Sequence, residues 1–425
     1  MACMTTLSEL AQAIPAALER LDGVAARTPV LHNPRLSQAT GSEIWLKRED
    51  LQPVRSYKLR GAYNLIAQLS EEEKAAGVVC ASAGNHAQGV AFSCAQLGIQ
   101  ATIYVPHTTP RQKRERILAI GRGSVQLVLA GSTYDQASEA AKAFAAQEGR
   151  VLVPAFDDPR TIAGQATCIV EAVDQLGFVP DVVAVPVGGG GLFAGCCAWL
   201  RSNHPSVRIV GVEPEGAPCV AAALSAGRPM KLQEIDTFVD GAAVSRVGDV
   251  PFEIIREARP ELVRIPEGQV CSEMLAMYQV DGIIAEPAGA LAAAALPTGG
   301  VGHRVQIPPG SKVLVLVSGG NNDVARYAEV VERSLIHEGR KRYFLVSFPQ
   351  APGALRRFLD DVLGPEDDIT HFEYIKRSSR ETGPAVVGIE LHNPGDYPFL
   401  MQRINEVGME VELITYGSPL FRFLI

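Results

Sequence analysis

Short apolar runs rich in β-branched residues alternate with alanine-rich segments over the first 325 residues. Most of these runs end in glycine or a small polar residue, which is typical of strands buried in a parallel sheet. Six strands are predicted in this way, at 77–84, 101–106, 125–131, 181–191, 208–214 and 312–322. Four intervening segments have the length and the Gly or Pro endings of helices: 86–98, 109–121, 134–149 and 192–205. The alternation predicts an α/β fold with helices covering a mostly parallel sheet.

A different pattern begins near residue 340. Strands are predicted at 340–350, 368–378, 383–393 and 409–417, with helices at 351–364 and 397–408. The resulting order, βαββαβ, is that of the ferredoxin-like α+β unit.

Length and charge limit the classes of function. A chain of 425 residues is too long for one ordinary domain, and 47% hydrophobic with 20% charged residues is typical of a soluble globular protein. The formal net charge of −8 argues against a nucleic-acid or membrane partner, because anionic partners favour clustered Lys and Arg. The basic cluster at 111–116 is expected to be the solvated face of a helix.

The sequence also bears on the cellular compartment. The first residues do not resemble a signal peptide, and no apolar run of about 18 residues predicts a transmembrane span. The eight cysteines lack C-x-x-C pairs and lie among apolar neighbours: Cys3, Cys80, Cys94, Cys168, Cys196, Cys197, Cys219 and Cys271. Reduced, mostly buried thiols and a cytoplasmic location are therefore expected.

Four consecutive glycines, Gly188 to Gly191, follow an apolar strand and precede the helix that begins near Leu192. Residues without Cβ let successive backbone N–H groups converge on an anion at a positive helix terminus. A phosphate group fits such a turn. A dinucleotide-binding fingerprint is a weaker alternative that leaves the other motifs unexplained, although its positions are matched by Gly189, Gly191, Ala194 and Glu213.

Small polar residues follow two other predicted strands. In "SAGNHAQG" (82–89), Ser82, Asn85 and free N–H groups at a helix start could bind a carboxylate, while His86 is an acid, a base or a structural residue. In "SGGNN" (318–322), Ser318 offers a neutral hydroxyl. Because ligands bind outside the carboxyl ends of parallel strands, these residues are expected at one site.

Lys58, in "SYKLRGAY", begins a predicted helix that packs closely. By itself it could be a surface lysine. Beside a phosphate-binding turn, its amine could instead form a Schiff base with a phosphorylated aldehyde, since burial lowers the pKa of an amine and makes it more nucleophilic.

Five ordered motifs resemble those of the fold-type II pyridoxal-phosphate enzymes, and the threonine ammonia-lyase (threonine dehydratase) group is the most similar. The motifs are S-Y-K-L-R-G-A, S-A-G-N-H-A-Q-G-V-A, V-G-G-G-G-L, E-P-A-G-A and S-G-G-N. The resemblance implies a tryptophan synthase β-like catalytic domain at 1–328, with two parallel-sheet subdomains. The small one, at about 61–155, is inserted in the large one.

The resemblance further implies pyridoxal 5'-phosphate as cofactor. Lys58 would bind it covalently and later take the α-proton of the substrate. The cofactor phosphate would be held by Gly188, Gly189, Gly190, Gly191 and Leu192. Asn85 would face the phenolic oxygen of the ring and Ser318 its nitrogen. The substrate carboxylate would lie in the loop formed by Ser82, Ala83, Gly84, Asn85 and His86, and Glu286 would sit beside ring and substrate.

The implied reaction removes water from L-threonine and releases 2-oxobutanoate and ammonia, the first step of isoleucine biosynthesis. Related serine racemases carry a second serine where this chain has Ala83, which favours elimination over racemisation. The segment at 212–220 resembles the cation loop of the family through Glu213 and Ala217, but Cys219 stands where metal-binding members have a carboxylate. No metal is therefore assigned.

After a connector at 329–339, residues 340–425 resemble the ACT-like regulatory domain of biosynthetic threonine ammonia-lyases, in the short form with one such unit. The resemblance implies feedback inhibition by isoleucine, with valine opposing it, and a homodimer or homotetramer. A domain that serves assembly and binds no effector is the alternative.

Four other functions stay open at this point. An L-serine dehydratase or a serine racemase would use the same fold. A catalytically silent amino-acid sensor would keep the fold without turnover. The presence of Lys58 and Ser318 argues against such a loss of catalytic activity. A nicotinamide dehydrogenase rests on the glycine fingerprint alone.

Overall fold

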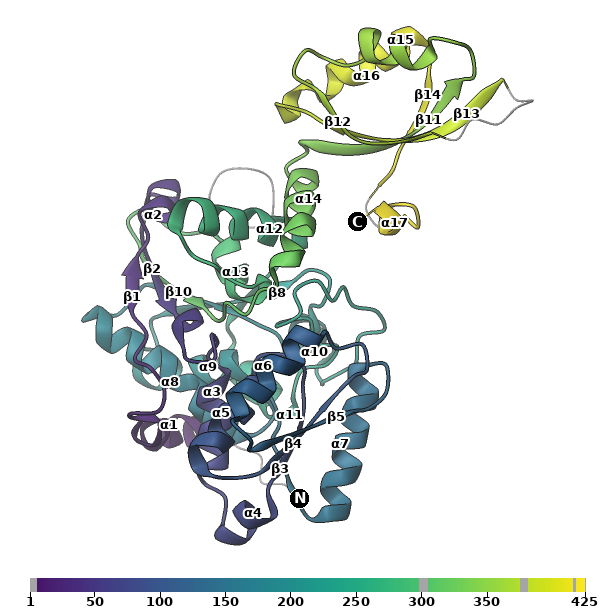
Figure 1. Ribbon diagram of the computed structural model, residues 1–425. Helices are drawn as coiled ribbons and strands as arrows, with labels where there is room; N and C mark the ends of the chain where they lie inside the picture. The colour runs from purple at the N-terminus through teal and green to yellow at the C-terminus, as the bar shows by residue number, and fades with distance from the viewer. Residues whose placement is uncertain (1–5, 298–304, 375–380, 416–417, 425) are drawn as a thin grey trace. The chain divides into compact units, whose positions relative to one another are not determined.

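The computed structural model describes residues 6–297, 305–374, 381–415 and 418–424 (Figure 1). Contacts divide the chain into two compact units, Met1–Asn322 and Asp323–Ile425. The boundary between the two units, after Asn322, lies close to residue 325, where the alternating α/β sequence pattern ends. Helix α14, Tyr327–His337, covers most of the segment expected to connect the two domains.

The larger sheet of the first unit has six strands in the order β1-β2-β10-β7-β8-β9. Only the β1–β2 pair is antiparallel. The strands are β1 Val30–His32, β2 Glu43–Arg48, β10 Lys312–Val317, β7 Val182–Pro186, β8 Arg208–Pro214 and β9 Glu261–Ile265. Strands β7, β8 and β10 are almost wholly buried, in accord with their near-continuous apolar sequences.

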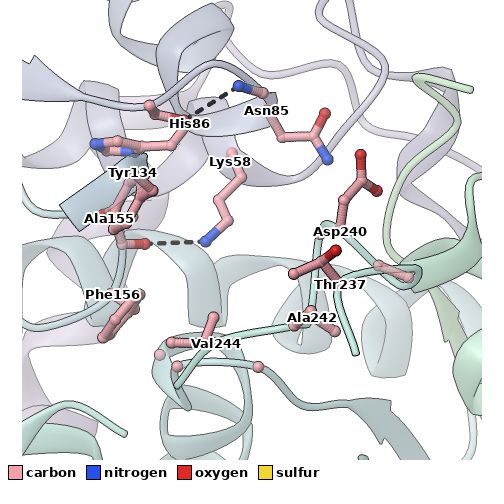
Figure 2. Close-up of a pocket in the computed structure, with 18 of the residues that line it drawn as sticks. Lys58, Asn85, His86, Tyr134, Ala155, Phe156, Thr237, Asp240, Ala242 and Val244 are labelled. Atoms are coloured by element: carbon pink, nitrogen blue, oxygen red, sulfur yellow. Dashed lines mark hydrogen bonds between the residues drawn. The ribbon is translucent and has the colours of Figure 1, made fainter. Parts of the chain in front are cut away.

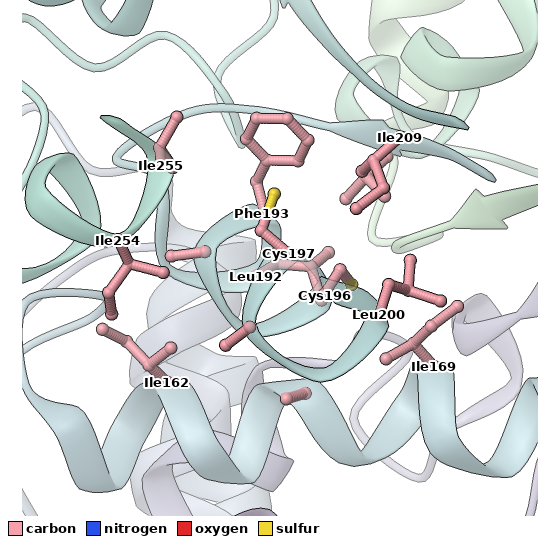
Figure 3. Packing of buried hydrophobic residues seen from close by; sticks show 14 of the residues in the cluster. Ile162, Ile169, Leu192, Phe193, Cys196, Cys197, Leu200, Ile209, Ile254 and Ile255 are labelled. Carbon is pink, nitrogen blue, oxygen red and sulfur yellow. The ribbon is translucent and has the colours of Figure 1, made fainter. Parts of the chain in front are cut away.

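Helices α1, α8, α9 and α11 bury one face of this sheet (Figure 3). Ile162 and Ile169 of α8 pack in the same cluster as Phe193 of α9 and Ile255 of α11. The bounds are α1 Leu7–Leu21, α8 Pro159–Leu176, α9 Gly191–Asn203 and α11 Asp249–Ala258. The seven cysteines in the described part of the chain are buried thiols outside any disulfide, as expected, and Cys3 lies outside that part.

The remaining elements of the first unit include a helix that packs on the larger sheet. Helix α13 packs on β7, β8 and β10 and also contacts α12. The bounds are α2 Pro34–Thr40, α4 Glu71–Ala76, α10 Cys219–Ala226, α12 Glu267–Ala276 and α13 Pro287–Ala294. A short 3₁₀ helix spans Glu49–Leu51 and a π-helix spans Met277–Asp281.

A smaller, all-parallel sheet has the order β5-β4-β3-β6. Its strands are β3 Val78–Ala81, β4 Ala101–Val105, β5 Val125–Leu129 and β6 Val151–Leu152, and its helices are α3 Lys58–Ile66, α5 Asn85–Leu97, α6 Arg111–Gly121 and α7 Tyr134–Glu148. Because side chains alternate along a strand, Val78 and Cys80 face a cluster built with α3 and α5, whereas Val79 faces the alanines of α7. Two parallel sheets are thus confirmed.

The second unit has the predicted βαββαβ order. Its four strands form an antiparallel sheet in the order β12-β13-β11-β14, and the helices bury an aromatic and aliphatic core against it. The elements are β11 Lys341–Pro349, α15 Ala354–Asp361, β12 Asp368–Tyr374, β13 Thr382–Glu390, α16 Tyr397–Val407 and β14 Glu410–Leu413, followed by α17 Phe421–Leu424; 3₁₀ turns span Val324–Arg326 and Pro394–Asp396. The ferredoxin-like prediction is confirmed.

The predicted strands form, but those at 181–191 and 312–322 end early, at Pro186 and Val317. The residues that follow form the loops that carry the glycine-rich motifs. Strands β1, β2, β6 and β9 were not predicted, and neither was the long helix α8. Within the described residues, no helix is long and apolar enough to cross a membrane.

Candidate active site

A cavity of about 660 Å³ lies where the carboxyl ends of β3, β7 and β10 meet. Every residue that the sequence suggested for cofactor or substrate lines it: Lys58, Ser82, Ala83, Gly84, Asn85, His86, Gly188, Gly189, Gly190, Gly191, Leu192, Glu286 and Ser318. The loops after parallel strands meet at one edge of a sheet, which explains how motifs more than 250 residues apart share a wall.

Lys58 is held at the first turn of α3 by close backbone contacts. The N–H of Tyr57 donates to the carbonyl of Ser318, and a Cβ on Gly89 of α5 would lie 3.0 Å from the Lys58 backbone. The Lys58 amine donates a 3.0 Å hydrogen bond to the carbonyl oxygen of Ala155 (Figure 2). Burial lowers the pKa of Lys58 to about 8, although the carboxylate of Glu286 acts in the opposite direction. A larger fraction of this amine than of a surface lysine is therefore neutral near pH 7 and available as a nucleophile or base.

The tetraglycine turn joins β7 to α9 and needs residues without side chains. Gly190 has φ +92°, which disfavours other residues, and a Cβ on Gly189 would lie 2.5 Å from the ring of Phe156. The N–H groups of residues 188–191 donate to no backbone acceptor among the described residues, and helix α9 starts at Gly191. The turn therefore offers several donors at the positive end of a helix, a suitable site for a phosphate.

The loop after β3 places further donors in the lining of the cavity. Gly84 precedes the first residue of α5, and its N–H donates to the hydroxyl of Ser82 at 3.2 Å. Asn85 begins the helix, so the N–H groups of the first turn have no helical acceptors. This loop can bind a carboxylate through backbone donors.

His86 is almost completely buried beside this loop. Its Nε2 lies 2.8 Å from the carbonyl oxygen of Val153, and no partner for its Nδ1 lies in the described structure. Burial and the nearby charge of Lys58 lower the pKa of His86 to about 4. A neutral ring that donates through Nε2 fits a structural role better than that of a general acid.

Glu286 is a buried carboxylate at the start of α13. Its Oε1 accepts a 2.6 Å hydrogen bond from the amide of Asn85, whose own Oδ1 accepts one from Asn321. Burial, with the charge of Asp240 adding to it, raises the pKa of Glu286 to about 7. Ser318 follows the last residue of β10, and its hydroxyl donates a 3.1 Å hydrogen bond to the carbonyl oxygen of Ala288 in α13.

Several cavity residues were not predicted. Ala155 and Phe156 come from the bend between β6 and α8, and Thr237, Ala242 and Val244 come from a loop without regular structure (Figure 2). None carries a distinctive sequence signal, since their roles depend on a backbone carbonyl and on packing. The small-residue run at 241–243 was the one available hint, because Gly188 packs against Ala242.

The basic cluster at 111–116 lies on helix α6 and is mostly exposed, as expected, although Lys113 and Arg114 are half-buried. Lys113 lines the cavity and pairs with Asp240 at 3.1 Å, and Lys231 pairs with Asp135 at 2.5 Å. These two ion pairs join helices α6 and α7 to the loop that contains Lys231 and Asp240.

In the region that resembles a cation loop, the polar side chains of Glu213 and Cys219 have hydrogen-bond partners within the protein. Both carboxylate oxygens of Glu213 accept hydrogen bonds from the first turn of α10, at Val220 and Ala221, while burial raises the pKa of Glu213 to about 7. The thiol of Cys219 donates to the carbonyl of Gly188. Among the described residues, no group of three or more His, Cys, Asp or Glu side chains could hold a metal ion.

Two family models match the chain. The model described as "Pyridoxal-phosphate dependent enzyme" matches residues 21–319. The model described as "C-terminal regulatory domain of Threonine dehydratase" matches residues 332–424. Together they cover both units of the structure.

Curated relatives match over nearly their whole length. The chain is 54% identical to a biosynthetic L-threonine dehydratase IlvA of Mycobacterium tuberculosis, over 97% of this chain and 95% of the relative. It is 50% identical to the enzyme of the same name from Corynebacterium glutamicum, over 99% and 97%.

Solved structures have the same fold. A processed threonine deaminase isoform 2 from Solanum lycopersicum superposes with a TM-score of 0.71 at 36% identity, over 77% of this chain and 93% of that one. A maize serine racemase superposes with a TM-score of 0.69 at 28% identity, over 79% and 99%.

Proposed function

We infer the function of this chain from its family, because it belongs to the pyridoxal-phosphate dependent enzymes and, among them, to the biosynthetic L-threonine dehydratases. It is a lyase that converts L-threonine to 2-oxobutanoate and ammonia by elimination of water, the first step of isoleucine biosynthesis. The single observation that carries this proposal is the presence of a lysine amine with a lowered pKa and a tetraglycine turn in one cavity.

The cavity fits pyridoxal 5'-phosphate. The turn at 188–191 and the N–H of Leu192 would hold the phosphate, and the amine of Lys58 would bind the aldehyde. Asn85 and Ser318, which line the same wall as Glu286, would face the polar atoms of the ring. Because the glycines have no side chains, a phosphate can approach the backbone N–H groups of the turn closely.

When bound, pyridoxal phosphate supplies an electron sink for negative charge at the substrate α-carbon. The residues of the chain provide position and proton transfer. Backbone donors at 82–86 bind the substrate carboxylate, which orients the α-proton toward Lys58. A base with a pKa of about 8 is both partly deprotonated and sufficiently basic near neutral pH, so Lys58 takes the α-proton.

Glu286 supports this arrangement from the side. A carboxyl group with a pKa of about 7 carries a proton part of the time at neutral pH. Its hydrogen bond from Asn85 ties the start of α5 to the start of α13. We assign it the role of orienting Asn85, with contact to substrate as a second role.

The C-terminal unit is a regulatory domain, and isoleucine is proposed as its inhibitory effector, with valine opposing it. Helix α15 begins at Ala354, so the N–H groups of Leu355 and Arg356 in its first turn have no acceptor within the helix and could bind a carboxylate. We further propose that the chain acts in the cytoplasm as a homodimer or homotetramer, because antiparallel units of this kind commonly pair between chains.

The decisive experiment measures 2-oxobutanoate from L-threonine by the purified protein, with and without isoleucine. Turnover that isoleucine suppresses supports both the reaction and the effector. Turnover that is indifferent to isoleucine retains the reaction and removes the effector. A protein that shows the visible absorbance of bound cofactor but no turnover of L-threonine contradicts the proposed substrate. Parallel reactions with L-serine, analysed for pyruvate and for D-serine, test the dehydratase and racemase alternatives.

A further inference from the structure

The bend between β6 and α8 presents three successive carbonyl groups, and each accepts at least one hydrogen bond from a side chain. His86 donates to Val153, Thr161 to Pro154 at 3.3 Å, and Gln165 to Ala155 at 3.0 Å. Thr161 and Gln165 lie four residues apart and therefore on one face of α8. These side chains add to the single backbone bond that ties this segment to a strand, from the N–H of Val153 to the carbonyl of Val79 in β3.

Only the last of these carbonyls touches the reactive amine. The oxygen of Ala155 accepts from Lys58 Nζ and from Gln165 Nε2, at 3.0 Å in both cases. An isolated carbonyl in a bend can reorient, whereas a second donor keeps its oxygen in place. The position of the free amine is therefore set jointly by its own helix and by Gln165.

The second amide atom of Gln165 also lies next to the site. Gln165 is fully buried, and no partner for its Oε1 lies in the described structure. A Cβ on Gly191 would come within 2.6 Å of this atom, and a Cβ on Gly61 within 2.9 Å of Gln165 Cγ. The side chain thus fills the junction between α3, which carries Lys58, and the tetraglycine turn. A buried polar atom without a partner is costly, which argues that the side chain is kept for a reason other than stability.

We propose that Gln165 is a positioning residue for Lys58, which holds the Ala155 carbonyl as the acceptor of the free amine. The proposal rests on the assignment of Lys58 as the reactive amine. Hydrogen bonding of the ammonium form to a fixed acceptor stabilises that form. Loss of the Gln165 donor releases the carbonyl, weakens the acceptor and lowers the pKa of Lys58 below its native value.

The test replaces the amide by a side chain of similar size, Gln165→Met, in the full chain. With the cofactor removed, Lys58 is modified with trinitrobenzenesulfonate over pH 6–10 and quantified by peptide mass spectrometry. Native protein should give a midpoint near pH 8. A midpoint about one pH unit lower is expected in the variant, with about fivefold faster modification at pH 7.

A matched control is available on the same helix. Gln175 also donates through Nε2 to a backbone carbonyl, Thr28 O at 3.0 Å, but lies ten residues from Gln165 and away from the cavity. Gln175→Met should leave the Lys58 midpoint unchanged. Equal midpoints in all three proteins, or equal displacement in both variants, would overturn the proposal.

The cofactor-loaded enzyme gives an independent readout. The acidic limb of the pH profile of kcat for L-threonine should move downward by the same amount in Gln165→Met. If L-threonine is not the substrate, this profile is lost while the labelling difference persists, so the two proposals fail separately. If Gln165→Met does not fold, Gln165→Asn shortens the amide by one methylene group and should give the same displacement. A native midpoint in that variant would contradict the proposal.

Discussion

The Oε1 atom of Glu286 lies 2.6 Å from the amide nitrogen of Asn85, although the two residues are 201 positions apart in the chain. This hydrogen bond joins the first turn of α5 in the small subdomain to the N-cap residue of α13 on the large sheet. Both side chains line the cavity that contains Lys58. The contact therefore fixes the starts of the two helices relative to each other at the cavity.

Removal of the Lys58 amine should abolish turnover without unfolding the protein. Lys58→Ala loses both the group that binds the cofactor and the base, so kcat for L-threonine should fall by at least about a thousandfold. The visible absorbance of covalently bound cofactor should also disappear. Lys142→Ala, on the exposed face of α7, is the control and should retain both properties. Substantial turnover by Lys58→Ala would exclude the assigned role.

Glu286 should make the stability of the protein depend on pH. Because burial raises its pKa from about 4.5 to about 7, the native state holds this proton more tightly than the unfolded state does. The resulting stabilisation is present below about pH 4.5 and is lost as the pH rises to 7.

Glu286→Gln cannot titrate, so its free energy of unfolding relative to native protein should rise by about 2–3 kcal/mol between pH 5 and pH 8. Urea denaturation at the two pH values measures this difference. Exposed Glu72→Gln should show none. A difference that does not change with pH would mean that Glu286 titrates normally.

Gly189→Ala should weaken cofactor binding through Phe156. The added Cβ would lie 2.5 Å from the Phe156 ring, so the turn or the ring must move. A loss of about tenfold to a hundredfold in affinity for pyridoxal phosphate is expected, because the N–H donors no longer converge. Equilibrium titration followed by cofactor absorbance measures this affinity. The double variant with Phe156→Leu should recover part of the loss, and a double variant no better than Gly189→Ala would contradict the steric explanation.

Ala83→Ser should add racemisation to elimination. Ala83 lines the cavity with Lys58, so a serine hydroxyl placed there would face the bound substrate and could return a proton to its α-carbon. With L-serine as substrate, chiral chromatography should detect D-serine in the variant above the level given by native protein. Ala87→Ser, on the buried side of α5, controls for the added hydroxyl. Formation of pyruvate alone by Ala83→Ser would show that the hydroxyl is not within reach of the α-carbon.

The sequence by itself determined the elements whose residues carry their own local signal. Apolar runs such as 208–214 became β8 because a strand buried on both faces needs an unbroken apolar sequence. The glycines at 188–191 and the small polar residues after β3 and β10 identified residues that line the cavity. They could be recognised because ligands bind outside the carboxyl ends of parallel strands. The βαββαβ order of the C-terminal unit followed from local patterns in the same way.

Only the tertiary structure decided what depends on residues distant in the chain. Helix α8 was not predicted, although its sequence has an apolar face at helical spacing. What the sequence could not show is that Gly164 and Gln165 on this helix pack against α3. The carbonyl of Ala155 as the partner of Lys58 and the placement of Lys113 at the cavity arise from folding alone. Backbone acceptors and long-range ion pairs leave no trace in sequence spacing, since any residue supplies a carbonyl and any exposed helix can carry a lysine.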